Sequence, residues 1–274
     1  MEHIKRADRI GIIVKLLTDT PNRVHNYSEF CDMFSVAKST VSEDIEIIIS
    51  SFGKYKSGIV ETIAGAAGGV RYRPYQSRET QREILTKVAR MLSEPGRLLP
   101  GGFLYSSDIA SDPQITYDLA NIVASKYYDN APDFVLTMET KGIPFALMTA
   151  KALGVSLVIA RRDSKAYEGS AVKINYTSGS DNEQIDTMAI SRRAVKAGQK
   201  ALIVDDFVKG GGTLLGMSEM MKECQIEVLG VEVMIKTEKP AEKLCANVNS
   251  LLVLKGIDRI SSACEVVPDA KYLI

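Results

Sequence analysis

The chain has 274 residues, of which 45% are hydrophobic and 25% charged, so it is long enough for two domains with sizeable apolar cores. Its 34 Lys and Arg residues equal its 34 Asp and Glu residues, which excludes a uniformly basic nucleic-acid binder and leaves any polyanion to a local patch. No apolar run approaches the ~20 residues of a membrane span, and charges such as Lys15 interrupt a secretory leader, so we expect a cytoplasmic protein.

Histidine and cysteine are too sparse for the usual catalytic or zinc sites. The only histidines, His3 and His25, leave the rest of the chain without an imidazole for a Ser-His triad or a zinc site. The cysteines form no CxxC pair and are expected to be reduced and buried: Cys31, Cys224, Cys245 and Cys264. We therefore predict no metal site.

Two helices are predicted before residue 35. Small and apolar residues recur at helical spacing from 7 to 17, and Pro21 follows the end of this first helix. Its expected buried face is Ala7, Ile10, Gly11, Val14 and Leu17. Asn26 followed by Glu29 is a capping-box pattern that starts a second helix. The apolar side of that helix is Phe30, Met33 and Phe34.

A third helix is predicted to begin between Lys38 and Thr40, with Thr40 and Glu43 as a second capping box. Its apolar positions fall on one face: Val41, Ile45, Ile48, Ile49 and Phe52. The polar residues of its first turn stay exposed, which is where a recognition helix meets base edges and phosphates.

A β-hairpin is predicted next, with strands at 58–64 and 70–73 and a glycine-rich turn at 65–69. Three helices and this hairpin make a winged helix. Arg71 and Arg73 alternate with apolar residues, so they share one face of the wing and could reach a DNA backbone or a minor groove. The predicted contacts with double-stranded DNA are Lys5, Arg6, Lys38, Ser39, Thr40, Ser42, Arg71 and Arg73.

Protein contact or dimerisation is the alternative role for this winged helix. Its acidic residues nearly balance its basic ones. Asp44 and Glu46 also lie on the third helix, where carboxylates repel phosphate unless they turn away.

Pro74 interrupts the hairpin, so we place a boundary near residues 74–78, with a winged-helix domain at 1–75 and a larger domain at 76–274. A helix at 77–93 is expected to pack between the two. Beyond it, strands at 134–138, 156–160, 201–204, 226–235 and 251–254 alternate with helical patterns. This alternation predicts an α/β fold with a mostly parallel sheet and a ligand at the carboxyl ends of the strands.

The segment from Asp205 to Thr213 lies between a short apolar strand and a helix. Its three successive glycines, residues 210–212, let backbone N–H groups wrap a phosphate, and the helix N-terminus adds its dipole. Asp205 and Asp206 would repel phosphate but could hold the hydroxyls of a sugar, or a Mg²⁺ that the ligand chelates. The pattern therefore favours a sugar phosphate over inorganic phosphate.

The run Ala-Leu-Ile-Val-Asp-Asp-Phe-Val-Lys-Gly-Gly-Gly-Thr at 201–213 resembles the phosphoribosyl pyrophosphate (PRPP) motif of the type I phosphoribosyltransferases. The resemblance implies that Asp205 and Asp206 contact the ribose hydroxyls, that 210–213 enclose the 5′-phosphate, and that 139–142 form a pyrophosphate loop. The implied effector-binding residues are Glu139, Thr140, Lys141, Gly142, Asp205, Asp206, Phe207, Lys209, Gly210, Gly211, Gly212 and Thr213. A mobile loop would contain Arg161, Arg162, Lys165 and Tyr167, although a solvated surface turn is the alternative for its two arginines.

Lys209 departs from the pattern of the enzymes. Those that act on 6-oxopurines commonly have an acid here that serves as general base, and adenine-type enzymes usually have Ala. A lysine cannot act as a base unless its pKa is strongly lowered, but it can pair with a phosphate. This favours binding without turnover, with no catalytic residue.

Over nearly its whole length the chain is similar to the purine operon repressors of Gram-positive bacteria. Further matches are Lys-Ser-Thr-Val-Ser-Glu-Asp at 38–44, Gly-Ala-Ala-Gly-Gly-Val at 65–70 and Gly-Gly-Phe-Leu-Tyr at 101–105. The resemblance implies a homodimeric repressor of purine biosynthesis and transport genes that binds operator DNA and senses PRPP, with or without Mg²⁺. It also implies that guanine alarmone nucleotides compete at that site, with Tyr105 stacking on a base. An active purine phosphoribosyltransferase and a PRPP-regulated protein-interaction module are the alternatives.

Overall fold

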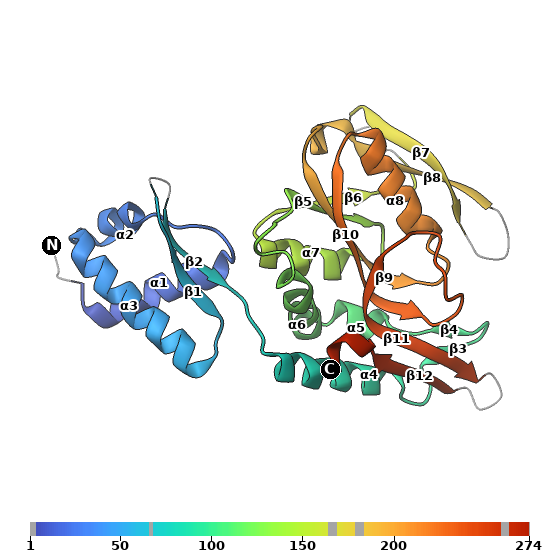
Figure 1. Cartoon of the computed structure of the whole chain (residues 1–274), viewed down its shortest axis with the longest axis horizontal. Helices are drawn as coiled ribbons and strands as arrows, with labels where there is room; N and C mark the ends of the chain where they lie inside the picture. The colour runs from blue at the N-terminus through green and yellow to red at the C-terminus, as the bar shows by residue number, and fades with distance from the viewer. Residues whose placement is uncertain (1–3, 66–67, 164–168, 179–183, 259–262, 274) are drawn as a thin grey trace.

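The computed structural model describes residues 4–65, 68–163, 169–178, 184–258 and 263–273. The chain forms two units, a helical unit at 4–73 and an α/β unit at 78–273, joined by a short connection at 74–77 (Figure 1). Within the described residues, the helical unit contains α1 (Arg6–Asp19), α2 (Tyr27–Phe34), α3 (Lys38–Tyr55), β1 (Ile59–Ile63) and β2 (Gly69–Arg73). This is the winged-helix arrangement that the sequence predicts.

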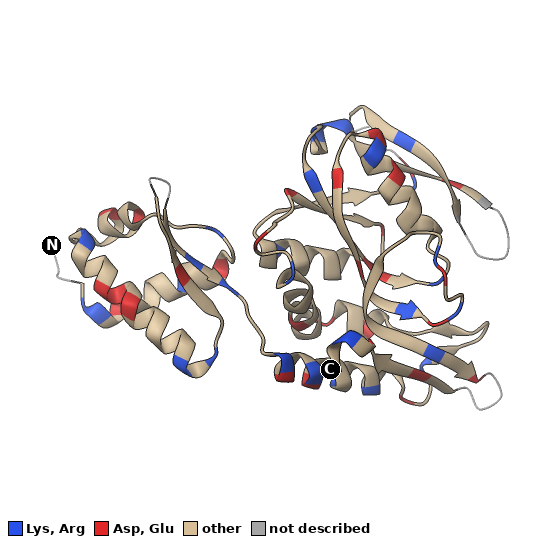
Figure 2. Ribbon diagram, in the orientation of Figure 1, with Lys and Arg blue, Asp and Glu red and all other residues tan. Residues whose placement is uncertain are grey.

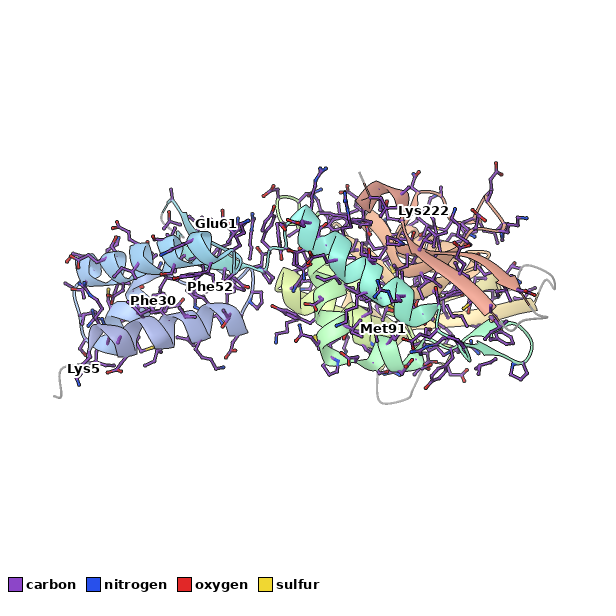
Figure 3. The ribbon with its side chains drawn as sticks, turned by 90° about the horizontal axis from the view of Figure 1, so that it is seen from below. Lys5, Phe30, Phe52, Glu61, Met91 and Lys222 are labelled. Atoms are coloured by element: carbon purple, nitrogen blue, oxygen red, sulfur yellow. The ribbon has the colours of Figure 1, made fainter. Side chains whose placement is uncertain are left out.

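The helical unit has its own apolar core, built from the inner faces of its helices and hairpin. The predicted capping box starts α2: the Asn26 side chain accepts a hydrogen bond from the Ser28 N–H, and Glu29 accepts one from the Asn26 N–H. Figure 3 shows Phe30 and Phe52 inside this unit. The fully enclosed side chains of this core are Ile13, Leu17, Phe30, Val41, Ile45, Ile48 and Val70.

Three predicted details of these helices are wrong. First, α1 buries Arg9, Ile13 and Leu17, whereas Ala7 and Gly11 are exposed, because the buried face includes a charged residue that apolar periodicity cannot detect. Second, Met33 is 51% exposed. Third, Thr40 and Glu43 form no capping box, because the N-cap of α3 is Ala37, which has no side-chain acceptor, and Thr40 lies inside the first turn.

The hairpin forms as predicted. β1 and β2 are antiparallel, from Ile59 opposite Arg73 to Ile63 opposite Gly69. Both wing arginines reach the same acceptor: the Nε atoms of Arg71 and Arg73 lie 2.7 and 3.1 Å from Glu61 Oε1, so the two side chains share a face. Two residues of the predicted turn, Ala66 and Ala67, lie outside the described residues.

The α/β unit is built on a sheet with strand order β12-β11-β10-β9-β5-β6, in which the described strands are parallel except for β12. Its strands are β5 (Phe134–Met138), β6 (Ser156–Ala160), β9 (Lys200–Val208), β10 (Glu227–Thr237), β11 (Val248–Asp258) and β12 (Ala263–Pro268). The mostly parallel α/β fold is therefore confirmed. β12 was not predicted.

Helices cover both faces of this sheet. The longer helices are α4 (Arg78–Leu92), α6 (Pro113–Ala124), α7 (Ile143–Leu153) and α8 (Gly212–Glu223); α5 (Ser107–Ser111), η2 (Arg192–Ala194) and η3 (Ala270–Tyr272) are short. One apolar core joins α4, α6 and α7 to the sheet, and a second joins α8 and the ribbon of β7 (Ala171–Ser178) and β8 (Gln184–Ser191) to the opposite face. The hairpin of β3 (Leu98–Leu99) and β4 (Phe103–Leu104) lies apart from the sheet.

The structure corrects the expected position of α4. This helix does not pack between the two units but lies within the α/β unit, against α6 and β12 (Figures 1 and 3). Leu85, Val88 and Leu92 form a buried apolar stripe along this helix. The stripe needs an apolar partner, and the antiparallel edge strand β12 supplies one.

Candidate functional site

Three of the predicted effector-binding segments meet at the carboxyl edge of the sheet. Asp205 and Asp206 lie near the end of β9, in the middle of the strand order. Because β5 and β9 are parallel neighbours, the loop 139–142 that follows β5 emerges beside them. The glycine segment 210–212 follows β9 directly and leads into α8. The structure thus brings three segments together that are far apart in sequence.

Gly142 makes the contact between the 139–142 loop and the acidic pair possible. A Cβ atom added to it would lie 2.3 Å from Asp205 Oδ1 and 2.6 Å from Thr137 Oγ1, so only glycine fits. Thr137 is a site residue that the sequence reasoning missed. Its hydroxyl is buried and has no hydrogen-bond partner among the described residues, so it can bond to a ligand that lies near the loop.

Asp205 and Asp206 form a crowded, desolvated carboxyl pair. Each is only 8% exposed. Burial raises the pKa of both carboxyls, and the negative charge of Asp206 raises the pKa of Asp205 further, while the Lys141 ammonium opposes the rise for Asp206. The Asp206 N–H donates to Asp205 Oδ1 at 3.0 Å. Such a pair is best satisfied by groups that donate hydrogen bonds to it, such as the neighbouring hydroxyls of a sugar.

The glycine segment positions the start of α8 as an anion site. Gly211 has a φ of +92°, in the left-handed region that favours glycine, and its carbonyl accepts the Leu215 N–H at 2.9 Å. The first N–H groups of a helix lack intrahelical acceptors and favour a bound phosphate. Lys209 precedes this segment and interacts with a neighbouring group.

Tyr176 is a second residue that the sequence reasoning missed. It lies on β7, is 6% exposed, and its hydroxyl is hydrogen-bonded to the side chain of Thr213 at the start of α8. Burial raises its pKa, which keeps the phenol neutral. A Cβ at Gly216 would lie 2.8 Å from Tyr176 Cβ, so the small residue on α8 allows this approach. No local motif marks Tyr176, because the contact depends on how the ribbon packs on α8.

The Glu139 side chain contacts the start of the predicted mobile loop, at Arg161 and Arg162. Its Oε1 accepts the Arg162 N–H at 2.8 Å, and its Oε2 lies 3.3 Å from Arg161 Nη1. These residues of two predicted ligand loops therefore contact each other. Lys165 and Tyr167 lie outside the described residues.

Tyr105 does not contact the acidic pair in the described part of the chain. It follows β4, is 42% exposed, and the Arg97 guanidinium lies 5.9 Å from the centre of its ring. No hydrogen bond or ring contact among the described residues joins it to the acidic pair. Its proposed stacking on a base stays a prediction.

The first turn of α3 presents the exposed polar face that DNA contact requires. Lys38 and Ser39 are exposed, and Thr40 and Ser42 are half-buried. Figure 2 shows basic residues at both ends of α3 and acidic residues between them. Asp44, however, is fully buried and bonded to Arg9, with Nε to Oδ2 at 2.7 Å, so its carboxylate does not face a ligand outside.

Further predicted DNA contacts differ in how available they are. Lys5 is exposed, whereas Arg6 lies 2.6 Å from Glu43. Arg71 is paired with Glu61 and partly exposed. Arg73 is 8% exposed and donates from Nη2 to the Tyr128 carbonyl at 2.8 Å, so it is used in contact with the α/β unit. The structure does not support DNA contact by Arg73, because sequence alternation gives the face of a strand but not what covers that face.

Within the described residues, no group of three or more His, Cys, Asp and Glu side chains gathers as a metal site. The Asp205–Asp206 pair offers carboxylate oxygens to Mg²⁺, which would need the remaining oxygens from a ligand or water. Among the helices described, none is long and apolar enough to cross a membrane.

Comparisons with known proteins match both units. Residues 5–74 match the family model "Bacterial purine repressor, N-terminal", and residues 107–258 match "Phosphoribosyl transferase domain". The chain is 39% identical to a probable purine biosynthesis transcriptional regulator of Streptococcus pneumoniae, over 96% of each chain. It is 38% identical to a purine biosynthesis transcriptional activator of Lactococcus lactis, over 96% of this chain and 97% of that one.

It is also 37% identical to a purine biosynthesis transcriptional repressor of Bacillus subtilis, over 96% of this chain and 92% of that one. A crystal structure of adenine phosphoribosyltransferase from Rhodothermus marinus matches with a TM-score of 0.54 at 20% identity, covering 63% of this chain and 99% of that one. This structural likeness supports the fold of the α/β unit.

Proposed function

The chain belongs to the bacterial purine repressor family, and from this premise we propose that it is a PRPP-sensing repressor that binds operator DNA through the helical unit. It is a transcriptional regulator of purine biosynthesis with an N-terminal DNA-binding domain and a phosphoribosyltransferase-like domain. The observation that carries the proposal is the meeting of the acidic pair, the 139–142 loop and the glycine segment at one edge of the sheet.

PRPP has a donor or a charge for each part of this site. Its ribose hydroxyls can donate to Asp205 and Asp206, whose burial makes such donors favourable. Its 5′-phosphate suits the N–H groups at the start of α8, and its pyrophosphate suits the 139–142 loop with Lys141. Guanine alarmone nucleotides carry the same phosphate chemistry, and we propose that they compete there. Mg²⁺ bound to PRPP would reduce its charge near the carboxyls.

PRPP binding would release DNA, because abundant PRPP signals that purine precursors exceed purine nucleotides. Thermodynamically, the ligand must bind more tightly to the DNA-free state. The Lactococcus lactis relative is named an activator, so we propose that DNA binding by this chain can also raise transcription. We further propose a homodimer that acts in the cytoplasm.

We propose that the α/β unit binds PRPP without turning it over. Lys209 occupies the position where 6-oxopurine enzymes commonly have an acid, and a lysine serves poorly as a general base. The expected result with PRPP, Mg²⁺ and each purine base is no steady nucleotide formation. Steady formation would favour the alternative, an active phosphoribosyltransferase.

The DNA-binding proposal is tested by titrating the protein into a fluorescent fragment of a purine promoter, with and without PRPP. Lys38→Ala should weaken binding to every DNA sequence and reduce the salt slope by about 1, because an exposed cation next to phosphate is lost. Lys87→Ala is the matched control, since Lys87 is exposed on α4 of the other unit. Binding that is unspecific, unchanged by PRPP, or equally weakened by both variants would contradict the proposal.

A further inference from the structure

Two helices of the α/β unit turn their C-terminal ends toward the helical unit. α6 and α7 pack side by side and lie on the face of the α/β unit nearest to the helical unit (Figure 1). Asn22 Nδ2 donates to the carbonyl of Leu153, the last residue of α7, at 2.9 Å. Arg73 Nη2 donates to the carbonyl of Tyr128, in the turn after α6, at 2.8 Å. The Leu153 carbonyl lies at a helix C-terminus, so it lacks an intrahelical partner and favours such a donor.

The contact between the units is buried and interconnected. Arg73 Nε donates to Asn22 Oδ1 at 3.3 Å, so the two residues that donate to the α/β unit are also bonded to each other. The Tyr128 hydroxyl donates to the Pro74 carbonyl at 2.8 Å, which fixes the connection itself. The backbones also approach closely, since a Cβ at Gly154 would lie 2.7 Å from the Pro21 carbonyl oxygen. A packed, hydrogen-bonded interface of this kind tends to switch between discrete arrangements and does not deform continuously.

The opposite end of α7 belongs to the candidate site. α7 begins at Ile143, directly after the 139–142 loop, and Gly142 packs on Asp205. Its 11 residues span about 16 Å at 1.5 Å per residue. Phe145, Ala146 and Leu153 are buried in the core of the α/β unit, which holds α7 as one rigid rod. This rod physically connects the 139–142 loop at one end to Leu153 at the other.

We propose that α7 transmits the state of the PRPP site to the helical unit, and that Asn22, supported by Arg73, is the coupling contact. This inference rests on the proposed function, because it describes how that site is regulated. PRPP would shift α7, change the Asn22–Leu153 hydrogen bond, and reorient the helical unit relative to DNA. Asn22 and Arg73 are thus positioning residues that contact neither ligand.

The test uses two variants of the full chain that separate the contacts of Asn22. Asn22 has a φ of +60°, so Asn22→Gly removes the side chain without backbone strain. Asn22→Asp keeps an acceptor for Arg73 but loses the donor to Leu153. For each protein, the DNA dissociation constant is measured with and without saturating PRPP, and the PRPP dissociation constant is measured by calorimetry.

In the unmodified chain, PRPP should weaken DNA binding by about 5- to 150-fold, the usual range of allosteric coupling. Both variants should reduce this factor to about twofold or less, while the PRPP dissociation constant without DNA changes by less than about threefold. Asp129→Ala is the control, because Asp129 also contacts Arg73 but is 97% exposed, where ion pairs contribute little. It should keep the full factor.

A full coupling factor in Asn22→Asp would overturn the inference, since the Leu153 contact would then be dispensable. If PRPP weakens DNA binding by the same factor in every variant as in the unmodified chain, the inference is overturned but the proposed function is left intact. If PRPP has no effect on DNA binding even in the unmodified chain, both fail together.

Discussion

Asp205 and Asp206 are buried carboxyls whose positions lower the stability of the folded chain. Burial disfavours their charged forms and raises the pKa of both carboxyls. Between the ordinary aspartate pKa of about 3.9 and the raised value, the folded chain binds more protons than the unfolded chain. The stability that depends on these groups is therefore fully present in acid and is lost as the pH rises through the raised pKa.

Asp205→Asn should stabilise the fold in the absence of ligand. At pH 8 the gain should be about 1–3 kcal/mol, the usual cost of an incompletely satisfied buried polar group. Each 1 kcal/mol corresponds to about 2–4 °C in melting temperature for a domain of this size. The gain should shrink toward pH 4, where the native carboxyl is neutral. PRPP affinity should fall at least about tenfold, because an acceptor for a ribose hydroxyl is lost.

Thermal unfolding followed by circular dichroism from pH 4.5 to 8, together with calorimetric titration of PRPP, checks this prediction. Glu223→Gln at the exposed end of α8 is the control and should show no gain that depends on pH. A lower melting temperature for Asp205→Asn at pH 8 would contradict the proposed electrostatic cost.

The acidic residues of α3 show why charge cannot be judged from residue type alone. Asp44 counts against DNA binding in the sequence, yet it is completely buried and paired with Arg9. Glu43 is paired with Arg6, and Glu46 remains exposed. Of the two carboxylates expected to repel phosphate, Asp44 and Glu46, only Glu46 is exposed, because the packing of α1 against α3 buries Asp44.

At the scale of elements, the 139–142 loop and α7 act together, so a small change at their junction should affect ligand binding. Gly142 has a φ of −68°, which any residue can adopt, so the effect of Gly142→Ala is steric: its Cβ would lie 2.3 Å from Asp205 Oδ1. We expect PRPP affinity to fall at least about tenfold. Overpacking should also lower the free energy of unfolding by about 1–3 kcal/mol.

Without PRPP, Gly142→Ala should bind operator DNA normally, which would make it a regulator that PRPP cannot release. A gel-shift titration with PRPP measures this. Gly11→Ala is the matched control, because no atom lies within 4 Å of the added Cβ. Normal release by PRPP in Gly142→Ala would show that the loop does not contribute to the site.

The elements that the sequence predicted are those with strong local patterns. β5 and β6 follow the predicted ranges, because a short apolar run between turn residues is a local signal. The β7–β8 ribbon and Tyr176 were missed, because they depend on packing against α8, far away in sequence. The same reason applies to Arg73: its place on the strand face is local, but its burial depends on Tyr128.

At the scale of the whole molecule, the equal numbers of basic and acidic residues conceal two separate surfaces. The exposed cations expected to contact DNA lie on the helical unit, whereas Lys141 and Lys209 accompany the candidate PRPP site in the α/β unit. Between the units lie hydrogen bonds from Asn22 and Arg73 to backbone carbonyls. DNA and PRPP therefore have little reason to compete for the same cations.

This separation predicts how salt affects regulation. DNA affinity should fall steeply between 50 and 200 mM salt, because counterions compete with the protein for phosphates, by about 10³-fold if six phosphates are contacted. If PRPP and DNA shared basic residues, PRPP would change the number of phosphate contacts, and its effect would weaken as salt rises. If PRPP instead lowers the population of the orientation that binds DNA, the phosphate contacts made by that orientation stay the same in number. We therefore expect the ratio of DNA dissociation constants with and without saturating PRPP to vary by less than about twofold over this range.

Fluorescence anisotropy at four salt concentrations, with non-operator DNA as the control, measures both the fall in DNA affinity and this ratio. A ratio that falls toward one at high salt would favour direct competition over the transmission of a structural change.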